Sequence, residues 1–474
     1  MTRAALTLLI VGLGACTGKP RVVVPSRPTE RPVRSCSYVV DELQAEPAVL
    51  DVIARCAGAQ ITGFSPAEST AAPFIAIERA SATWKTTREG WQFTATQHDV
   101  ELRYRVDLEG LAHESQRFDG ALRVGHSLIS PASTFLVQPE PLDVGVPIDL
   151  SVRVPDGEDF ASGLISTAPD SRHFRLQAHE ASVATYALFG RFQRQTVDVG
   201  GSELEIVTAD GPLDLAQAPL GRWASASARA VAAFYGHFSA PHVLLVLLPV
   251  RAQDQVIFGR VLPQSAPAVA LLLGEHTLET SLYQDWVLVH ELFHIGFPSF
   301  HDEARWLDEG SATYFEPIIR ARAGHLSELE VWSAFARDMP RGLHAIEREG
   351  LEHPSQFRSV YWSGAIACLL ADVAARQRSH NRRGLEDGFR AILRAGGDAT
   401  QVWSLARVSQ VIDTALGAPI LREIIASHAD RASPVELDRL LERLGVIRLG
   451  DGSVKLDDSA ELAPVRHAIT FGGT

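Results

Sequence analysis

Two histidines and a glutamate lie close together in an apolar stretch of the second half of the chain. Residues Val287 to His294 read V-L-V-H-E-L-F-H, inside a helix that we expect over Leu282 to Ile295. His290 and His294 are offset by only about 40° around such a helix and lie one turn apart, so both imidazoles can reach one divalent ion. Glu291 lies next to them without being needed as a ligand, a position that suits a general base acting on a metal-bound water.

A second acidic motif supplies the natural third ligand. A catalytic zinc site needs three protein ligands and one position left open for water. Further along the chain, W-L-D-E-G-S-A-T-Y begins a predicted helix, Glu309 to Ala323, and Glu309 is the candidate ligand. Gly296 and Pro298 end the first helix, and Asp308 can cap the second, so a short loop folds the two helices alongside each other. The alternative is that Asp308 and Glu309 bind no metal and only place negative charge at a helix N-terminus, where it is favourable.

His301 is the rival third ligand, because metzincins use H-E-x-x-H-x-x-G-x-x-H. That pattern demands a glycine at position 297 and a histidine at position 300, where this chain has Phe297 and Phe300. Gly296 and His301 each miss by one residue. Met339 stands in a charged Asp-Met-Pro-Arg context that does not resemble a Met-turn. We therefore discount a metzincin.

The first 15 residues have the order of an export signal. Arg3 supplies a positive charge, Ala4 to Gly12 form an apolar run, and L-G-A-C places small residues directly before Cys16. This resembles a bacterial lipoprotein signal, which implies a lipid on Cys16 and a place in the cell envelope, at the periplasmic face of the outer membrane. A short buried segment with a chance cysteine is the alternative. No other apolar run approaches the roughly 18 residues needed to span a bilayer.

The other cysteines have separate interpretations. Residues 16–36 are rich in proline and arginine, a composition that stays extended and predicts a tether. Cys36 and Cys56 bracket a predicted helix from Asp41 to Ala57, and in an exported protein they can form a disulfide. Cys368 lies in an apolar run and is expected to be a buried, inert thiol.

Alternation of apolar and polar residues predicts strands in the first half of the chain, as in E-L-R-Y-R-V from position 101. We expect an α+β chain with an antiparallel β-rich domain over 37–210. A segment rich in glycine, proline and aspartate marks the boundary. A mixed α/β and then helical domain over 211–445 and a C-terminal tail over 446–474 follow.

Net charge excludes one class of function. The 474 residues include 57 acidic and 44 basic side chains, for a formal net charge of -13. Nucleic-acid binders carry a clustered basic excess that displaces counterions from phosphates. We therefore expect no nucleic-acid partner.

The two motifs H-E-L-F-H and W-L-D-E-G together resemble the gluzincin metallopeptidases, whose catalytic domain is thermolysin-like. The later Y-W-S-G-A helix from Tyr361, followed by R-G-L-E-D, is more particularly similar to the glycyl aminopeptidase family. The resemblance implies one Zn²⁺ bound by His290, His294 and Glu309, with Glu291 as general base. It also implies that Tyr361 donates to the oxyanion, a role that would stabilise charge on a tetrahedral intermediate.

The chain departs from this pattern upstream of the histidines. Gluzincin aminopeptidases hold the substrate amine with a glutamate of a G-x-M-E-N or G-L-E-H element. This chain offers only L-G-E-H with Glu275, either a degenerate amine anchor or a charge at a strand end. We predict a membrane-anchored zinc peptidase acting on a peptide or protein, with aminopeptidase and endopeptidase action both open. The alternative is a lipoprotein that retains zinc and binds peptides without cleaving them.

Overall fold

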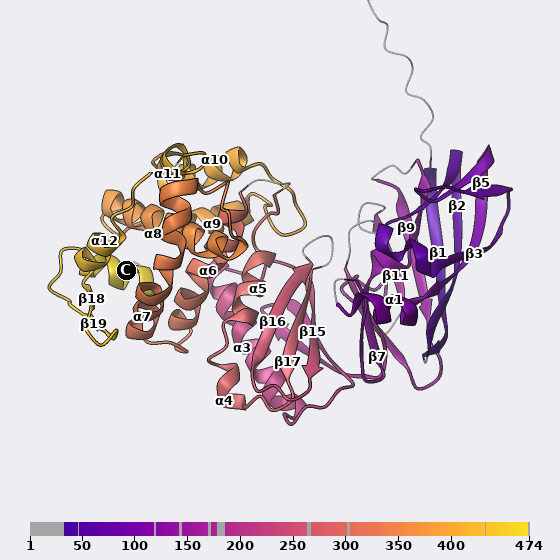
Figure 1. Cartoon of the computed structure of the whole chain (residues 1–474), viewed down its shortest axis with the longest axis horizontal. Coiled ribbons are helices and arrows are strands. Elements are labelled where there is room, and N and C mark those ends of the chain that lie inside the picture. Colours follow the sequence, from indigo (N-terminus) through magenta and orange to yellow (C-terminus); the bar gives the residue numbers. More distant parts are fainter. Residues whose placement is uncertain are drawn as a thin grey trace, which may run out of the picture.

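The structure is a computed structural model of the chain. It describes residues 33–45, 47–117, 120–141, 145–168, 172–177, 185–262, 267–300, 304–431 and 433–472. The predicted signal, Cys16 and most of the predicted tether lie outside these residues. An N-terminal β unit adjoins a second unit, in which a five-stranded sheet is followed by helices (Figure 1). Within the described ranges, no helix combines the length and apolarity that crossing a membrane requires.

The N-terminal unit is built from two sheets. The larger has the order β11-β9-β1-β2-β5-β3, with β4 on β5 and β8 on β2, and all pairs are antiparallel except β1 with β9. Its strands are β1 (Val33–Ala45), β2 (Ala48–Pro66), β3 (Ile75–Ala80), β4 (Trp84–Thr86), β5 (Trp91–Asp107), β8 (Val137–Glu140), β9 (Pro147–Arg153) and β11 (His173–Gln177). The smaller sheet joins β10 (Asp159–Ser162), β12 (Tyr186–Gly190), β7 (Ser127–Pro131) and β6 (Leu122–Val124). The described residues of this unit also form the short helices η1 (Ser69–Phe74), α1 (Leu108–Ser115) and η2 (Ala132–Thr134).

The prediction of a helix from Asp41 to Ala57 is wrong. This segment forms the antiparallel pair β1 and β2, in which Cys36 lies opposite Cys56 and forms a disulfide with it. Burial alternates along both strands, with Tyr38 and Val40 buried on the first. That period of two and the β-branched valines outweigh any helical preference. The disulfide prediction is confirmed, and because β1 begins at Val33, the last residues of the predicted tether are strand.

The sheet of the second unit has the order β13-β14-β15-β17-β16. Its strands are β13 (Phe192–Val199), β14 (Ser202–Ala209), β15 (His242–Val250), β16 (Val256–Leu262) and β17 (Ala268–Gly274). The three central strands are parallel, and antiparallel strands form both edges. The boundary predicted after position 210 therefore falls too late, because β13 and β14 belong to this sheet. The composition shift that suggested it is only the turn before the next helix.

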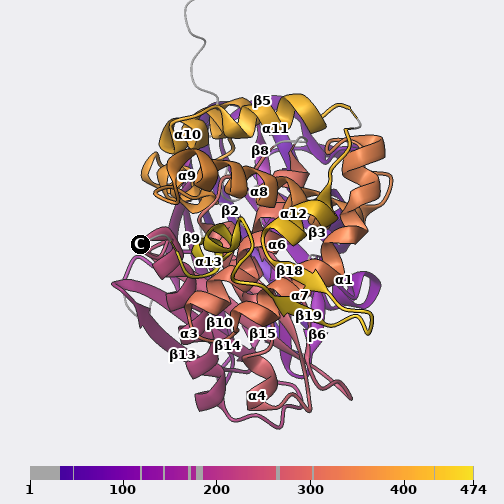
Figure 2. The ribbon, with the colours of Figure 1, turned by 90° about the vertical axis from the view of Figure 1, so that its left-hand side faces the viewer.

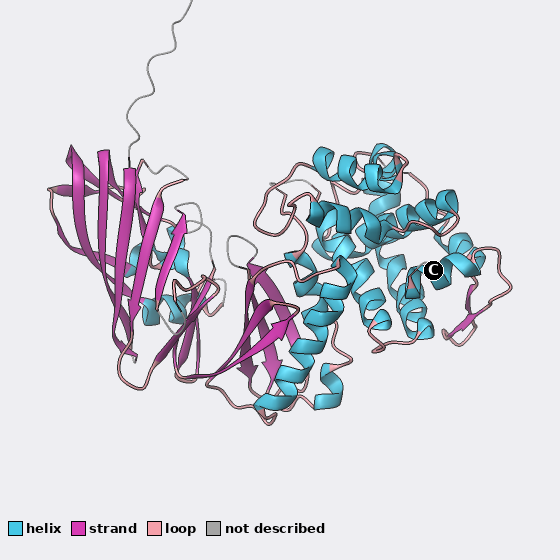
Figure 3. Cartoon of the chain, turned by 180° about the vertical axis from the view of Figure 1, so that it is seen from behind, coloured by secondary structure: helices cyan, strands magenta, loops and turns pink. Residues whose placement is uncertain are grey.

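Alternate residues of the central strands pack in opposite directions. Leu245 and Leu271 face the helices of the second unit, whereas Leu244 and Ala270 pack against Ile129 and its neighbours from the N-terminal unit. The sheet therefore forms a middle layer between the N-terminal sheets and the helices. Figure 3 shows the strands at one end and in the middle, and the helices at the other end.

Helices make up most of the remaining chain, and Figure 2 shows them in front of the N-terminal sheet. They are α3 (Gln217–Tyr235), α4 (Glu279–Leu282), α5 (Val287–Ile295), α6 (Arg305–Arg322), α7 (Glu328–Asp338), η3 (Met339–Gly342), η4 (Ala345–Glu349), α8 (Phe357–Ser379), α9 (Leu385–Arg394), α10 (Leu405–Leu416), α11 (Ile420–His428), α12 (Leu437–Arg443) and α13 (Ala463–Phe471). The helix predicted over Leu282 to Ile295 begins later, at Val287, and Leu282 is the last residue of the separate short helix α4.

The predicted C-terminal tail is folded. It contains β18 (Val446–Arg448), β19 (Val454–Leu456) and α13. The indole of Trp332 on α7 donates to the Thr470 hydroxyl, and Arg322 on α6 donates to two backbone carbonyls of α13. These buried and partly buried hydrogen bonds make the segment part of the helical layer.

Candidate metal centre

Helix α5 holds both histidines in a rigid position. The carboxylate of Asp285 accepts hydrogen bonds from the backbone N–H groups of Val287 and Leu288, each at 3.1 Å, and so caps the first turn. Loss of solvent contact raises the pKa of Asp285 to about 6. His290 and His294 are 3% and 8% exposed. Their rings are therefore fixed by packing before any ion binds.

The two histidines and Glu309 converge on one point. Glu309 Oε2 lies 3.3 Å from His290 Nε2 and 3.7 Å from His294 Nε2. One donor atom from each of the three residues lies within 4.8 Å of the other two. Burial alone would raise the pKa of Glu309, but hydrogen bonds from both histidines hold it below its usual range. Two imidazole nitrogens and a carboxylate oxygen are a donor set that zinc uses at catalytic sites.

Asp308 has a different position from the predicted one. Helix α6 begins at Arg305, so Asp308 lies in its first turn and does not cap it. Its Oδ1 lies 2.9 Å from His294 Nδ1. Burial would lower the pKa of His294, but Asp308 and Glu309 outweigh burial and raise it. A carboxylate on Nδ1 fixes the ring with its other nitrogen towards Glu309, as around metal-binding histidines generally.

Glu291 is held by the edge strand of the sheet. The backbone N–H of Val261 on β16 donates to Glu291 Oε2 at 2.9 Å. The strand comes this close because position 259 is a glycine, where a Cβ would lie 2.9 Å from Glu291 Cγ and 2.6 Å from Val287 Cγ1. Desolvation raises the pKa of Glu291. A carboxylate with a raised pKa accepts a proton readily, as a general base must.

Tyr361 is the fifth residue of α8 and faces the same point. Its ring stacks on His290 with 6.0 Å between ring centroids and 28° between ring planes. Burial and then the charges of Glu309 and Glu291 raise the pKa of the phenol. The hydroxyl therefore stays protonated at neutral pH and can donate.

A pair of glycines brings α6 and α8 together. A Cβ on Gly310 would lie 2.4 Å from Gly364 Cα, and one on Gly364 would lie 1.8 Å from the Trp306 carbonyl oxygen. Only glycine at both positions permits this approach. The glycine directly after Glu309 and the one three residues after Tyr361 thus place the two side chains side by side.

Glu275 does not reach this centre, which favours the second of its two interpretations. Its carboxylate accepts a hydrogen bond from the Ala252 N–H at 3.0 Å, in the turn between β15 and β16. Val261, which contacts Glu291, pairs with Val269 near the start of β17. Glu275 follows the other end of that strand, about 20 Å away at about 3.3 Å per residue. It is a charge at a strand end.

Two further predictions concern the discarded third ligand. His301 lies outside the described residues. Met339 is buried in η3, after α7.

Cys368 is buried and unpaired in α8, as predicted, and burial raises the pKa of its thiol. A buried protonated thiol is a poor nucleophile.

Sequence reasoning missed two contributors to the site. The Val261 N–H is a backbone group, and its contact with Glu291 depends on how β16 lies against α5. Trp286 lies edge-on against His290, with 5.3 Å between ring centroids. Its position four residues before His290 was a visible signal, because such residues share a helix face.

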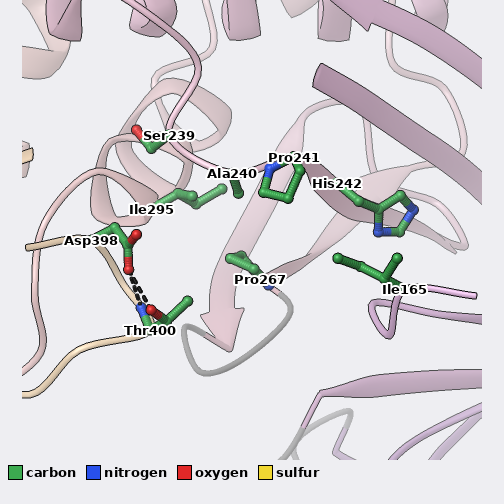
Figure 4. Close-up of a pocket in the computed structure, with 9 residues that line it drawn as sticks. All are labelled: Ile165, Ser239, Ala240, Pro241, His242, Pro267, Ile295, Asp398 and Thr400. Atoms are coloured by element: carbon green, nitrogen blue, oxygen red, sulfur yellow. Dashed lines mark hydrogen bonds between the residues drawn. The ribbon is translucent and has the colours of Figure 1, made fainter. Parts of the chain in front are cut away.

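A separate cavity lies beside Ile295, the last residue of α5 (Figure 4). It has a volume of about 50 Å³ and contains none of the residues that converge on Glu309. Ile165 of the N-terminal unit and His242 of β15 both contribute to it. The hydrogen bonds from Thr400 to Asp398, at 2.9 and 2.6 Å, fix its far wall.

Comparison with known proteins places the fold. No protein-family model matches the sequence, and neither does any curated protein. Among solved structures, the chain is similar to an aminopeptidase N family protein from Idiomarina loihiensis, with a TM-score of 0.68 and 15% identity over 87% of this chain and 78% of that one.

The chain is also similar in fold to solved structures of M1 zinc metallopeptidases. An M1 zinc metallopeptidase variant from Deinococcus radiodurans bound to a Tyr-Ser-Ala substrate matches with a TM-score of 0.57 and 16% identity, over 85% of this chain and 95% of that one. A two-domain M1 zinc metallopeptidase variant bound to L-arginine matches with a TM-score of 0.56 and 15% identity, over the same shares of the two chains. At these identities the likeness establishes the two-domain fold.

Proposed function

We propose that this protein is a zinc-dependent peptidase that hydrolyses peptide bonds. The observation that carries the proposal is the convergence of His290, His294 and Glu309 beside Glu291, on the fold of the M1 zinc metallopeptidases. Zinc, when bound, supplies a Lewis acid that polarises a carbonyl group and makes water more acidic. No side chain here has to act as a covalent nucleophile.

Three residues around the metal centre each have a role in the remaining steps of the reaction. Glu291 takes a proton from the attacking water and passes it to the leaving amine, a role that its raised pKa favours. Tyr361 donates a hydrogen bond to the carbonyl oxygen as negative charge develops there. Asp308 keeps His294 in the orientation that a ligand needs.

Exchange of Glu291 for glutamine tests the proposal. Purified wild type and Glu291→Gln are analysed for zinc and then assayed on a library of quenched fluorescent peptides. We expect one zinc per chain in both proteins and a loss of kcat of about 10²- to 10⁴-fold in the variant, the usual contribution of a general base. Glu279→Gln is the matched control, because the partly exposed Glu279 carboxylate pairs with Arg222 on α3, and it should keep full activity. Equal turnover in all three proteins would refute the assignment, and zinc without turnover in the wild type would favour the non-catalytic binding lipoprotein.

We further propose that a lipid on Cys16 anchors the protein in the bacterial cell envelope. The apolar run before L-G-A-C and the disulfide between Cys36 and Cys56, which suits an oxidising compartment, support this. Fractionation of cells that express wild type or Cys16→Ala provides the test. The wild type should sediment with membranes and carry a lipid by mass spectrometry. An unmodified Cys16 in the wild type would contradict the anchor.

A further inference from the structure

The helix face that carries both histidines also carries Trp286, which directly precedes α5. Trp286, His290 and His294 are spaced by four residues, so their side chains form one row along the helix. The indole meets the imidazole of His290 edge-on, at 90° between ring planes. Trp286 is 51% exposed, whereas His290 is 3% exposed. The row therefore begins at the surface and ends at the metal centre.

Strand β16 runs along the same helix. Gly259 faces Val287 and Glu291, and Val261 contacts Glu291, so β16 follows α5 from the metal centre towards Trp286. Because β16 is an edge strand of the sheet, one side of its backbone can pair with an extended peptide. A peptide bound there with a carbonyl at the metal centre would place a neighbouring residue next to Trp286.

Trp286 is held on a rigid base. Both carboxylate oxygens of the preceding Asp285 accept hydrogen bonds from the first turn of α5. The indole is also fixed on one side by His290. A large aromatic side chain that is rigid and half-exposed beside a polar site is available to a ligand at little cost in conformational entropy.

We infer that Trp286 determines specificity by stacking on an aromatic or long aliphatic side chain of the substrate, one residue from the cleaved bond. The inference rests on the proposed peptidase function. It predicts a preference for large apolar residues on one side of the cleaved bond. A purely structural Trp286 would shield His290 from solvent and would affect all peptides equally.

Paired peptides that differ only in phenylalanine or alanine beside the cleaved bond test the inference. The wild type should cleave the phenylalanine peptide about 10- to 100-fold better in kcat/KM. Trp286→Ala should lose much more rate on the phenylalanine peptide than on the alanine peptide and should keep its zinc, and Trp286→Phe should keep most of the preference. Leu43→Ala is the matched control, because Leu43 is 49% exposed but belongs to the N-terminal sheet.

A binding measurement separates this inference from the proposed function. The same peptides are titrated against zinc-loaded wild type and Trp286→Ala, with tryptophan fluorescence and calorimetry as readouts. Tighter binding of the phenylalanine peptide that disappears in the variant supports the inference even if no peptide is cleaved. The inference is overturned if Trp286→Ala lowers turnover and affinity for both peptides by one factor, if it loses zinc, or if its preference matches that of the wild type.

Discussion

Replacement of Gly364 by alanine should separate α8 from α6 and uncouple Tyr361 from the metal centre. The new Cβ would lie 1.8 Å from the Trp306 carbonyl oxygen, whereas real Cβ contacts essentially never fall below 3.0 Å. The helices must therefore move apart by at least about 1.2 Å, the difference between these distances. Overpacking of this kind costs about 1–3 kcal/mol, of which the better helix propensity of alanine offsets about 1 kcal/mol. We expect a net destabilisation of up to about 2 kcal/mol.

The same displacement should lower the catalytic rate strongly, while the folded protein remains stable enough to be assayed. A shift of about 1 Å at a catalytic group can cost about 10²-fold in rate. His290, His294 and Glu309 lie on α5 and α6, so the zinc content should stay near one per chain. Gly450→Ala is the control, because a Cβ at that position meets nothing within 4 Å.

The assay combines thermal unfolding, zinc analysis and steady-state kinetics. Gly364→Ala should melt several degrees lower, keep its zinc and show a kcat reduced by about 10²-fold with a smaller change in KM. Gly450→Ala should match the wild type in all three measurements. If Gly364→Ala keeps wild-type melting and kcat, then the glycine pair does not set the distance between the helices, and our reasoning on Tyr361 fails.

Two further predictions concern charged contacts. Asp308→Ala should weaken zinc affinity by about 10- to 100-fold, because His294 loses the carboxylate that orients it, and competition with a chelator measures this; unchanged affinity would contradict that role. His242 contacts Glu205 at 3.1 Å and the Gly163 carbonyl of the N-terminal unit at 3.3 Å. Burial opposes its protonation, but Glu205 and Glu203 outweigh burial and raise its pKa. The contact therefore stabilises the fold below the ordinary pKa of histidine, and this contribution is lost as pH rises through the raised pKa. In denaturant titrations, His242→Gln should be less stable than wild type at pH 5.5 and nearly equal at pH 9, and a difference independent of pH would contradict the prediction.

Local patterns predicted what depends on neighbours in sequence. Helix geometry predicted that His290 and His294 can bind one ion, and the number of ligands that zinc takes pointed to Glu309 as the third. The acidic residue before Glu309 was recognised, but its role was not, because whether α6 begins at Arg305 or later decides whether Asp308 caps the helix or meets His294.

Features that depend on tertiary pairing were less predictable. The β1 and β2 pair escaped notice because its short apolar runs fit a helix and a strand almost equally well, and only the pairing partner decides. Strands β13 and β14 were assigned to the wrong domain, since nothing in their sequences says which sheet they join. Tyr361 was identified only by resemblance, because an aromatic residue near the start of a helix carries no chemical signal of its own.

Diffraction data collected at the zinc absorption edge would test the central claim most directly. The described part of the chain contains two groups of three residues that could hold an ion. In the second group, Glu203, Glu205 and His242, the guanidinium of Arg194 already pairs with Glu205. We predict one strong anomalous peak per chain, about 2.0–2.2 Å from the Nε2 atoms of His290 and His294 and from a carboxylate oxygen of Glu309. A zinc-loaded crystal without a peak at these three residues, or with its only peak at the second group, would contradict the account.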